Sequence, residues 1–421
     1  MSEFFKYSRI QLFAGMGLIL LLLHFNIYEK KIIDLDEIVY LHLAENMGWD
    51  CTNYNTVKLF PPGHYPRAVY SSPVFHHPPL IPYMIKMVSA FGIPASKAAR
   101  TINLLFLMSG IIYLYLLTEI LAGRAAALLS SLLMLVCPVF LLETNLIHID
   151  QFQAYFLLAG LYHYFHAEKN GKSQHLYVSG GFFALSMLVK FTSPVLFVFP
   201  VLLALRHFVR FRDRKSILIF LAVSSAGFVW WLYFLFRFHS LFPPEIMGDG
   251  TTMAVKPDAY YVVVSNRNWL TVWKLFAVIY PFFMLLYIVG TLYGSLILLR
   301  RWRRVSFVSA VTRHSSSLVL LNTAGLVSIL LFIAGNSFGN SVWVLRYYIQ
   351  IYPLIFLICA AAAVNLYRFF RSPALRSWLL TLSGLNIILI LFTSWSVVLY
   401  HGLIIKPSLF ILVPKLEHIL R

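Results

Sequence analysis

The stretch SILIFLAVSSAGFVWWLYFLF, residues 216–236, runs for 21 residues without a charge. A helix of about 20 apolar residues is long enough to cross about 30 Å of hydrocarbon. Similar stretches recur along the whole chain of 421 residues, of which 60% are apolar and only 12% charged. An ordinary soluble domain is about 25% charged, so this chain has too few charges to cover a globular surface. The sequence therefore predicts a polytopic membrane protein and excludes soluble, disordered, fibrous and disulfide-built chains.

The apolar runs between charged breaks predict about eleven membrane-spanning helices in an all-α fold. The expected spans lie near 10–28, 101–122, 125–142, 150–166, 176–190, 193–206, 216–238, 269–298, 316–335, 346–366 and 377–400. The segment before the first span carries few basic residues and no small-residue cleavage site. We therefore expect that span to be a retained helix rather than a signal peptide.

The basic residues predict the orientation of these spans. With the N-terminus in the cytoplasm, the short inner loops receive Lys6 and Arg9; Arg124; Lys169 and Lys172; Arg206, Arg210, Arg212, Arg214 and Lys215; Arg300, Arg301, Arg303, Arg304 and Arg313; and Arg368, Arg371 and Arg376. Dense Lys and Arg in short loops mark the cytoplasmic side, so we interpret these runs as topology anchors rather than binding sites. The two long segments on the outer side are then about 29–100 and about 239–268.

Three carboxylates, Asp34, Asp36 and Glu37, lie just beyond the first expected span. Ionisable residues at membrane depth are costly and are functional candidates by default. The three carboxylates repel one another, and burial against lipid would raise the pKa of at least one of them. Such a carboxylate can accept a proton from a substrate hydroxyl. The alternative interpretation is a solvated acidic start of a loop.

Two isolated cations lie at the outer ends of later spans. Lys190 is in a tight turn between two apolar runs, where it can bind a phosphate as a point charge or snorkel to the interface. Arg346 opens the tenth span beside aromatic residues. Its guanidinium fork can hold two phosphate oxygens, or it can serve as an interfacial anchor.

The interpretation of three further polar residues stays open. His76 and His77 precede two prolines and can contact a phosphate or sugar, play a structural role, or bind a metal. Adjacent positions do not place both rings on one metal, so a divalent metal remains an open option rather than an expectation. Asp150 opens the fourth expected span, where it can cap the helix or bind a sugar or an acceptor.

Two motifs in the first outer segment carry a family resemblance. Residues 36–47, DEIVYLHLAENM, resemble the Asp-Glu…Tyr…Ala…Met signature of the polyprenyl-phosphate-dependent glycosyltransferases of the GT-C fold. That group includes the aminoarabinose transferases that act on lipid A and the protein O-mannosyltransferases. Residues 77–80, HPPL, resemble the His-Pro-Pro-Leu of the O-mannosyltransferases, whereas the aminoarabinose enzymes have Lys at the first position.

Four further pieces follow in the order of the family, so that the resemblance covers about residues 30–355. They are Phe91-Gly92 with Ala98-Ala99-Arg100, then Asp150 as the second acidic position, then Leu188-Val189-Lys190-Phe191, and finally Arg346-Tyr347 with Tyr352-Pro353. The resemblance implies a catalytic transmembrane module over 1–240 and a variable transmembrane region over 241–421. Only residues 401–421 follow the last expected span, so we expect no soluble C-terminal domain, which is a departure from the family. It also implies a bacterial inner membrane with the active site on the periplasmic side.

The chemistry that the resemblance implies is transfer of a sugar from a polyprenyl-phosphate carrier to an acceptor hydroxyl, with inversion. The implied roles are a general base at Asp36, with Asp34 and Glu37 as alternates or orienters; donor phosphate binding by Lys190, Arg346, His77 and Tyr347; and sugar or acceptor binding by Asp150 and His76. The expected acceptor is a glycolipid or lipid-linked glycan, with protein Ser/Thr second. No Gly-rich phosphate loop for a nucleotide is visible, and no nucleic-acid partner is expected.

Two rival interpretations remain at this point. A transporter or lipid flippase would need ionisable residues or broken helices near the bilayer midplane and a trace of repeat symmetry. The candidate charges instead gather at one membrane face, which suits catalysis at the interface. A catalytically inactive scaffold of the same fold is the third possibility, and the presence of Asp36, Lys190 and Arg346 argues against it.

Overall fold

The computed structural model describes residues 9–24, 27–29, 35–50, 53–55, 58–59, 78–190, 193–239, 280–302, 317–337 and 349–403. These residues form helices and connecting turns, with no strand among them. The all-α class expected from the sequence is confirmed for this part of the chain.

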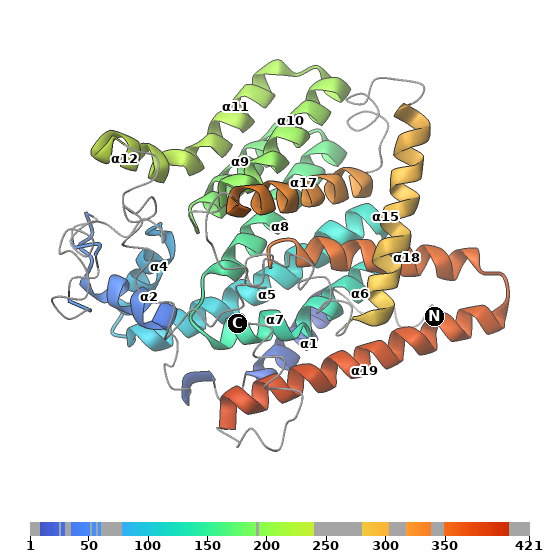
Figure 1. The fold of residues 1–421 in the computed structure, drawn as a ribbon, viewed down its shortest axis with the longest axis horizontal. Helices are drawn as coiled ribbons and strands as arrows, with labels where there is room; N and C mark the ends of the chain where they lie inside the picture. The colour runs from blue at the N-terminus through green and yellow to red at the C-terminus, as the bar shows by residue number, and fades with distance from the viewer. Residues whose placement is uncertain are drawn as a thin grey trace.

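The helices follow the apolar runs of the sequence (Figure 1). The N-terminal half contains α1 (Arg9–Leu23), η2 (Ile27–Glu29), α2 (Leu35–Asn46), α4 (Leu80–Ser89), α5 (Ala95–Ala122), α6 (Arg124–Leu135), α7 (Pro138–Asn145), α8 (Asp150–Asn170) and α9 (Ser173–Met187). The chain continues with η3 (Ser193–Phe197), α10 (Val198–Phe211), α11 (Arg214–Ser225), η4 (Ala226–Phe228), α12 (Val229–Phe238), α15 (Pro281–Trp302), α17 (Ser317–Ser337), α18 (Tyr352–Phe369) and α19 (Pro373–Leu403).

Five helical segments among the described residues are long and apolar enough to cross a membrane. They are Ala95–Ala122, Ser193–Phe211, Arg214–Arg237, Tyr352–Phe369 and Pro373–Phe392. The bent pair α6 and α7 provides a sixth if it acts as one span. The total of about eleven spans stays a prediction, because several expected spans are shorter here or extend into residues outside the described part.

The expected span 125–142 is divided into two helices that meet at an angle of 49°. Pro138 begins the second helix, α7. A proline inside a continuous helix would remove a hydrogen bond and clash with the preceding turn, so the helix axis changes direction before it. This bend turns α7 toward the start of α8 and shapes the connection between them.

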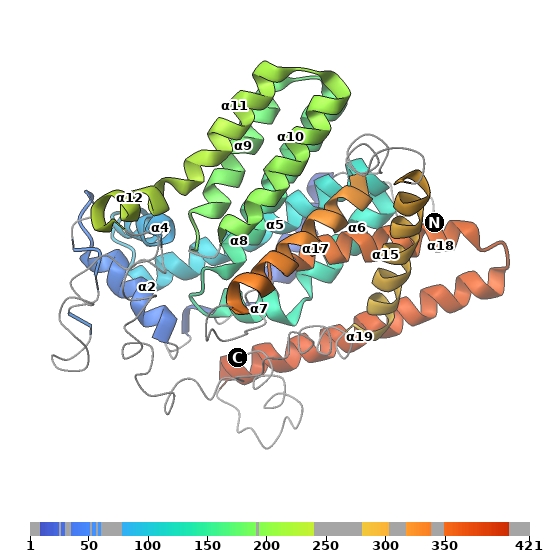
Figure 2. The same cartoon turned by 45° about the horizontal axis from the view of Figure 1, so that its top comes forward.

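The centre of the molecule is α8, which packs against α5 on one side and α9 on the other. Most of its residues are buried, including polar ones such as Gln151 and Gln153. The helices α9, α10 and α11 form a group that projects on one side, while α19 runs along the opposite side (Figures 1 and 2). Because α8 lies inside this bundle, it can carry polar side chains that a lipid-facing helix could not.

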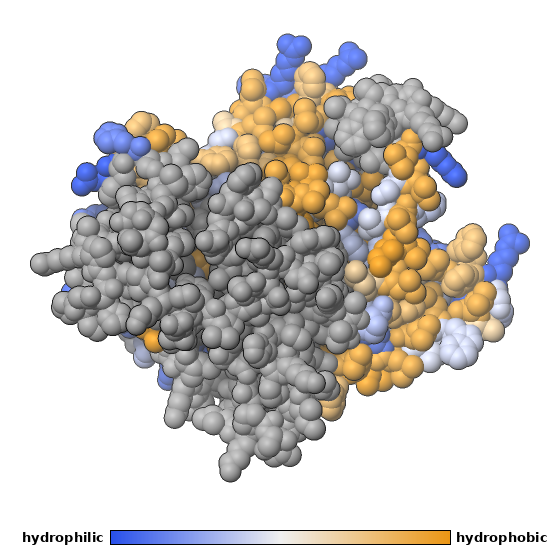
Figure 3. Space-filling view, viewed as in Figure 1, coloured by the Kyte–Doolittle hydropathy of each residue, from blue (hydrophilic) through white to orange (hydrophobic). Residues whose placement is uncertain are grey.

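The outside of the bundle is apolar over its long helices. Figure 3 shows apolar side chains gathered over α15 and over the group of α10 and α11. On α15 the exposed residues include Leu285, Leu292 and Leu296. An exposed apolar surface of this extent suits contact with lipid.

A second buried cluster fixes the position of α2. Trp230, Trp231 and Phe234 of α12 belong to one cluster with Val39 and Leu43 of α2, with Met47 just after that helix, and with Tyr54. The α2 helix is therefore held between α12 and the rest of the bundle, which brings its first turn toward the connection between α7 and α8.

Candidate active site

The connection between α7 and α8 is held in place through its backbone. Arg100, which is only 2% exposed, donates from Nη1 to the carbonyl oxygens of Ile27 at 2.9 Å and Asn145 at 3.1 Å. Asn103 donates from Nδ2 to the carbonyl oxygen of Leu146 at 2.8 Å. Both side chains come from the first turns of α5, so this helix fixes the position of the connection.

Glu37 joins the start of α2 to the same connection. Its carboxylate is fully buried, and Oε1 accepts a hydrogen bond from the backbone N–H of Ile147 at 3.0 Å. The same oxygen lies 3.8 Å from Nη2 of Arg100. These contacts suit an orienting role for Glu37, because they fix the helix turn that also carries Asp36.

A second buried ion pair lies at the other end of the connection. Nζ of Lys190 lies 2.5 Å from Oδ1 of Asp150, and the two residues are 5% and 2% exposed. Snorkelling does not describe a lysine so deeply buried. Asp150 is the first residue of α8 and follows the N-cap residue Ile149. The turn between α9 and η3 thus brings Lys190 to the start of α8.

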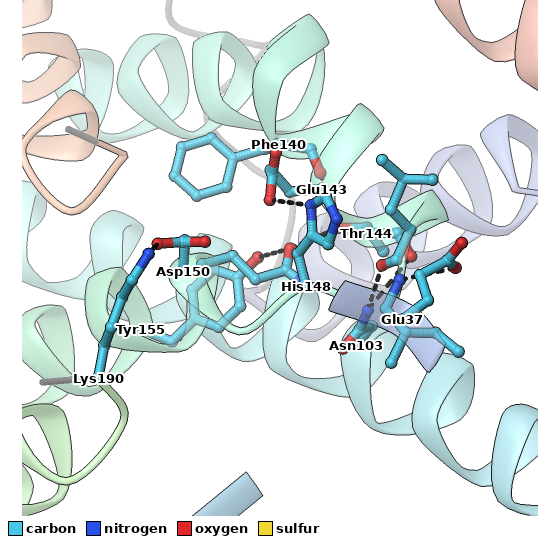
Figure 4. Close-up of polar contacts among 12 residues, drawn as sticks. Glu37, Asn103, Phe140, Glu143, Thr144, His148, Asp150, Tyr155 and Lys190 are labelled. Carbon is cyan, nitrogen blue, oxygen red and sulfur yellow. Dashed lines mark hydrogen bonds and ion pairs between the residues drawn. The ribbon is translucent and has the colours of Figure 1, made fainter. Parts of the chain in front are cut away.

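Sequence reasoning missed a third buried pair at this place. Nδ1 of His148 lies 2.8 Å from Oε2 of Glu143, and both residues are nearly inaccessible. Figure 4 shows this pair together with Glu37 and the Asp150–Lys190 pair. The sequence did contain a signal for this pair, because Glu143 and His148 are ionisable residues beside Asp150 in an otherwise apolar region.

A polar network extends from this pair into the core of α8. Oε1 of Gln151 accepts hydrogen bonds from Thr144 at 2.8 Å and from the Tyr155 hydroxyl at 2.9 Å. The candidate site therefore has polar groups from α2, α5, α7, α8 and the turn after α9. Its charged groups are neutralised in pairs, as buried charges must be.

The remaining candidate residues are placed as follows. Asp36 lies in the first turn of α2, and nothing is described of its side chain. Asp34, His76, His77, Arg346 and Tyr347 lie outside the described residues. In the part of the chain that the structure describes, no group of three His, Cys, Asp or Glu side chains could hold a metal ion. A divalent metal therefore remains the open option that it was in the sequence analysis.

Comparison with known proteins adds a family match and a fold. Residues 76–234 match the family model described as dolichyl-phosphate-mannose-protein mannosyltransferase, and this segment contains Asp150 and Lys190. No curated protein sequence matches the chain significantly.

The solved structures decide the fold. ArnT from Cupriavidus metallidurans, bound to undecaprenyl phosphate, superposes with a TM-score of 0.58 and 12% identity, covering 95% of this chain and 78% of that one. The Archaeoglobus fulgidus oligosaccharyltransferase in complex with Zn and sulfate gives a TM-score of 0.54 and 15% identity, covering 92% and 52%. The protein has the GT-C glycosyltransferase fold. The present chain spans only about half the length of the archaeal oligosaccharyltransferase.

A third match completes this comparison. The archaeal oligosaccharyltransferase AglB from the same organism, in complex with an inhibitory peptide and a dolichol-phosphate, gives a TM-score of 0.52 at 15% identity. It covers 93% of this chain and 55% of AglB. The GT-C fold and the apolar helices together identify an integral membrane protein, which confirms the class expected from composition.

Proposed function

We propose that the protein transfers one sugar from a polyprenyl-phosphate carrier to an acceptor hydroxyl on the outer face of the membrane. The observation that carries the proposal is the buried Lys190–Asp150 pair, which lies on the same connection as Glu37 of α2. The start of α2 contacts this connection at Ile147, and Lys190 contacts its far end at Asp150. The match of residues 76–234 to a mannosyltransferase family supports this reading.

The proposed reaction is a single displacement. The acceptor oxygen attacks the anomeric carbon, the bond from that carbon to the phosphate oxygen breaks, and the acceptor proton passes to Asp36. The lipid phosphate leaves with the bonding electron pair, and Lys190 stabilises the negative charge that develops on it. Attack from the side opposite the phosphate inverts the anomeric carbon.

The proposed roles are those that the family resemblance implies. Asp36 is the base, Asp34 supports it, and Glu37 orients the turn; Lys190, Arg346, His77 and Tyr347 bind the donor phosphate; Asp150 and His76 contact the sugar or acceptor. The Lys190–Asp150 contact makes Asp150 also the counter-ion that Lys190 has before the donor arrives.

The donor and membrane assignments draw on what the similar structures contain. The ArnT structure holds undecaprenyl phosphate and the AglB structure holds a dolichol-phosphate. We propose a lipid phosphate of this chemical class as donor carrier, and a glycolipid or lipid-linked glycan as acceptor, with protein Ser/Thr second. The proposed location is a bacterial plasma membrane, with the N-terminus in the cytoplasm.

The test is incubation of the purified protein with polyprenyl phosphate carrying mannose, glucose or aminoarabinose, measuring release of free lipid phosphate. Asp36→Asn keeps shape but removes the proton acceptor, so turnover should fall by roughly 10²–10⁴-fold with donor binding retained. Asp34→Asn should cost less. Near-normal turnover in Asp36→Asn with loss in Asp34→Asn would move the base by two residues, and no effect of either would end the transferase proposal.

A further inference from the structure

Asn145, the last residue of α7, carries a buried carboxamide. The residue is 1% exposed, and neither Nδ2 nor Oδ1 has a hydrogen-bond partner within the described part of the chain. Its backbone carbonyl is held by Arg100, so the residue is fixed beside the start of α5. The structure therefore holds a donor and an acceptor in a buried place without satisfying either.

Gln151, in the first turn of α8, has a similar unpaired group. Its Oε1 accepts from Thr144 and Tyr155, while its Nε2 is buried and has no partner among the described residues. Thr144 precedes Asn145 and contacts Gln151, so the two amides flank one short stretch of chain. The stretch between them also carries the links to Glu37 and Lys190.

Unpaired buried polar atoms are uncommon. More than about nine in ten buried polar groups have a hydrogen-bond partner. The cost of leaving them unpaired is recovered when a partner of matching chemistry arrives. A carboxamide offers a donor and an acceptor without charge, which matches neighbouring hydroxyl groups of a sugar ring, since each hydroxyl both donates and accepts. A phosphate would satisfy only the donors.

We propose that Asn145 and Gln151 bind hydroxyl groups of the donor sugar, an inference that rests on the proposed function. In that reaction the base and the phosphate lie on opposite sides of the anomeric carbon, so the sugar lies between the start of α2 and Lys190. The stretch from Asn145 to Gln151 occupies this interval, because it contacts Glu37 through Ile147 and Lys190 through Asp150.

The test compares polyprenyl phosphate with and without a sugar. Asn145→Leu should bind bare polyprenyl phosphate as the wild type does, and bind the mannosyl, glucosyl or aminoarabinosyl donor preferred by the wild type about 10–100-fold more weakly. Its melting temperature without ligand should not fall, because the residue loses no hydrogen bond. Asn322→Leu is the matched control, since that amide bonds Tyr287 at 3.0 Å and Thr291 at 3.2 Å. It should lower the melting temperature and leave sugar discrimination intact.

Monodeoxy donors make the test independent of how any variant folds. The wild type should lose about tenfold in affinity for at least one monodeoxy sugar, and Asn145→Leu should no longer distinguish that sugar from the full donor. Equal discrimination between the two sugars by the wild type and by Asn145→Leu would overturn the inference. A fall in the melting temperature of Asn145→Leu as large as that of Asn322→Leu would also overturn it, because it would indicate that Asn145 binds a structural water. A wild type that binds sugar donors no better than bare polyprenyl phosphate would instead overturn the proposed function, and this inference with it.

Discussion

Lys190 and Asp150 neutralise each other in a buried place where either charge without its partner would be strongly destabilising. Their contact of 2.5 Å is buried between the start of α8 and the turn after α9. A buried charge that loses its partner is strongly destabilising, whereas loss of both charges together is often tolerated. The donor phosphate must therefore share Lys190 with Asp150 or displace it. A variant that loses only Lys190 and a variant that loses both charges therefore distinguish a structural role of the lysine from a phosphate-binding role.

We expect Lys190→Met to lower the free energy of unfolding by about 3–5 kcal/mol, because Asp150 is left buried without its cation. It should also weaken binding of polyprenyl phosphate by about 1.5–3 kcal/mol. The double variant Asp150→Asn/Lys190→Met should regain most of the stability but not the phosphate affinity. Thermal unfolding and lipid-phosphate titration measure the two effects. If the double variant binds polyprenyl phosphate normally, the lysine has only a structural role.

Glu37 provides a second residue-scale prediction. Glu37→Ala leaves the Ile147 N–H without its acceptor and Arg100 without its nearby carboxylate, so the free energy of unfolding should fall by about 3–5 kcal/mol. Glu37→Gln keeps an oxygen for the N–H and should cost clearly less. Thermal unfolding in detergent compares them. Equal losses in the two variants would mean that the Ile147 contact contributes nothing.

The sequence indicated several residues of the candidate site through one physical rule. Ionisable residues at membrane depth are costly and are therefore functional candidates. Glu37, Asp150 and Lys190 were found in this way. Their pairing was not predictable, because Lys190 and Asp150 are 40 residues apart and only the packing of α9 against α8 brings them together. Glu143 and His148 obey the same rule, but the expectations from the sequence do not include them.

At the scale of elements, the close approach of α5 to α8 depends on one glycine. A Cβ atom at Gly110 would clash with the Tyr155 ring, at only 2.3 Å from Cδ1. Tyr155 is fully enclosed and donates to Gln151. The α5–α8 interface therefore leaves no room for a methyl group at this position.

We expect Gly110→Ala to lower the free energy of unfolding by about 1–3 kcal/mol through overpacking. Because the displaced ring is Tyr155, donor affinity should fall as well. Gly181→Ala in α9 is the matched control, since no atom lies within 4 Å of its added Cβ. It should be neutral or stabilise by up to about 1 kcal/mol from helix propensity. Similar melting temperatures for both variants would contradict the packing argument.

Hydropathy located most helices but not their breaks or their partners. The expected span over 125–142 is two helices, and Pro138 was the visible reason. The buried position of α8 was harder to foresee, because its run of aromatic and polar residues has no clear apolar face. Whether a helix faces lipid or protein depends on its neighbours, and periodicity alone does not provide them.

At the scale of the whole molecule, charged contacts mark two opposite ends of the bundle. Asp150 begins α8, and Glu168 lies 18 residues later, a rise of about 27 Å at about 1.5 Å per residue. Glu168 contacts Arg206 and Arg210 of α10, and Arg206 also contacts Ser317 of α17. This distance is close to the thickness of the hydrocarbon core. The two charged ends of α8 are thus separated by about one thickness of the hydrocarbon core, as the predicted topology requires.

The topology can be tested with single cysteines at exposed positions. In a background with Cys51→Ser, the remaining Cys137 and Cys359 are buried. Lys97→Cys, at the start of α5, should react with a membrane-impermeant maleimide from the outside of spheroplasts. Gln174→Cys, at the start of α9, should react only after permeabilisation. Labelling of both from the same side would overturn the predicted topology and the proposed mechanism together.

The contacts of Arg100, Asn103 and Glu37 have an evolutionary consequence. All three side chains form hydrogen bonds with backbone carbonyl or N–H groups at the α7–α8 connection. Exchanging Asn145 or Leu146 for another residue would leave these anchors unchanged. If the connection binds the donor sugar as proposed, a substitution within it can change the sugar preference while these backbone anchors keep the connection in place. Among homologues, the three anchors should vary less than the residues they hold.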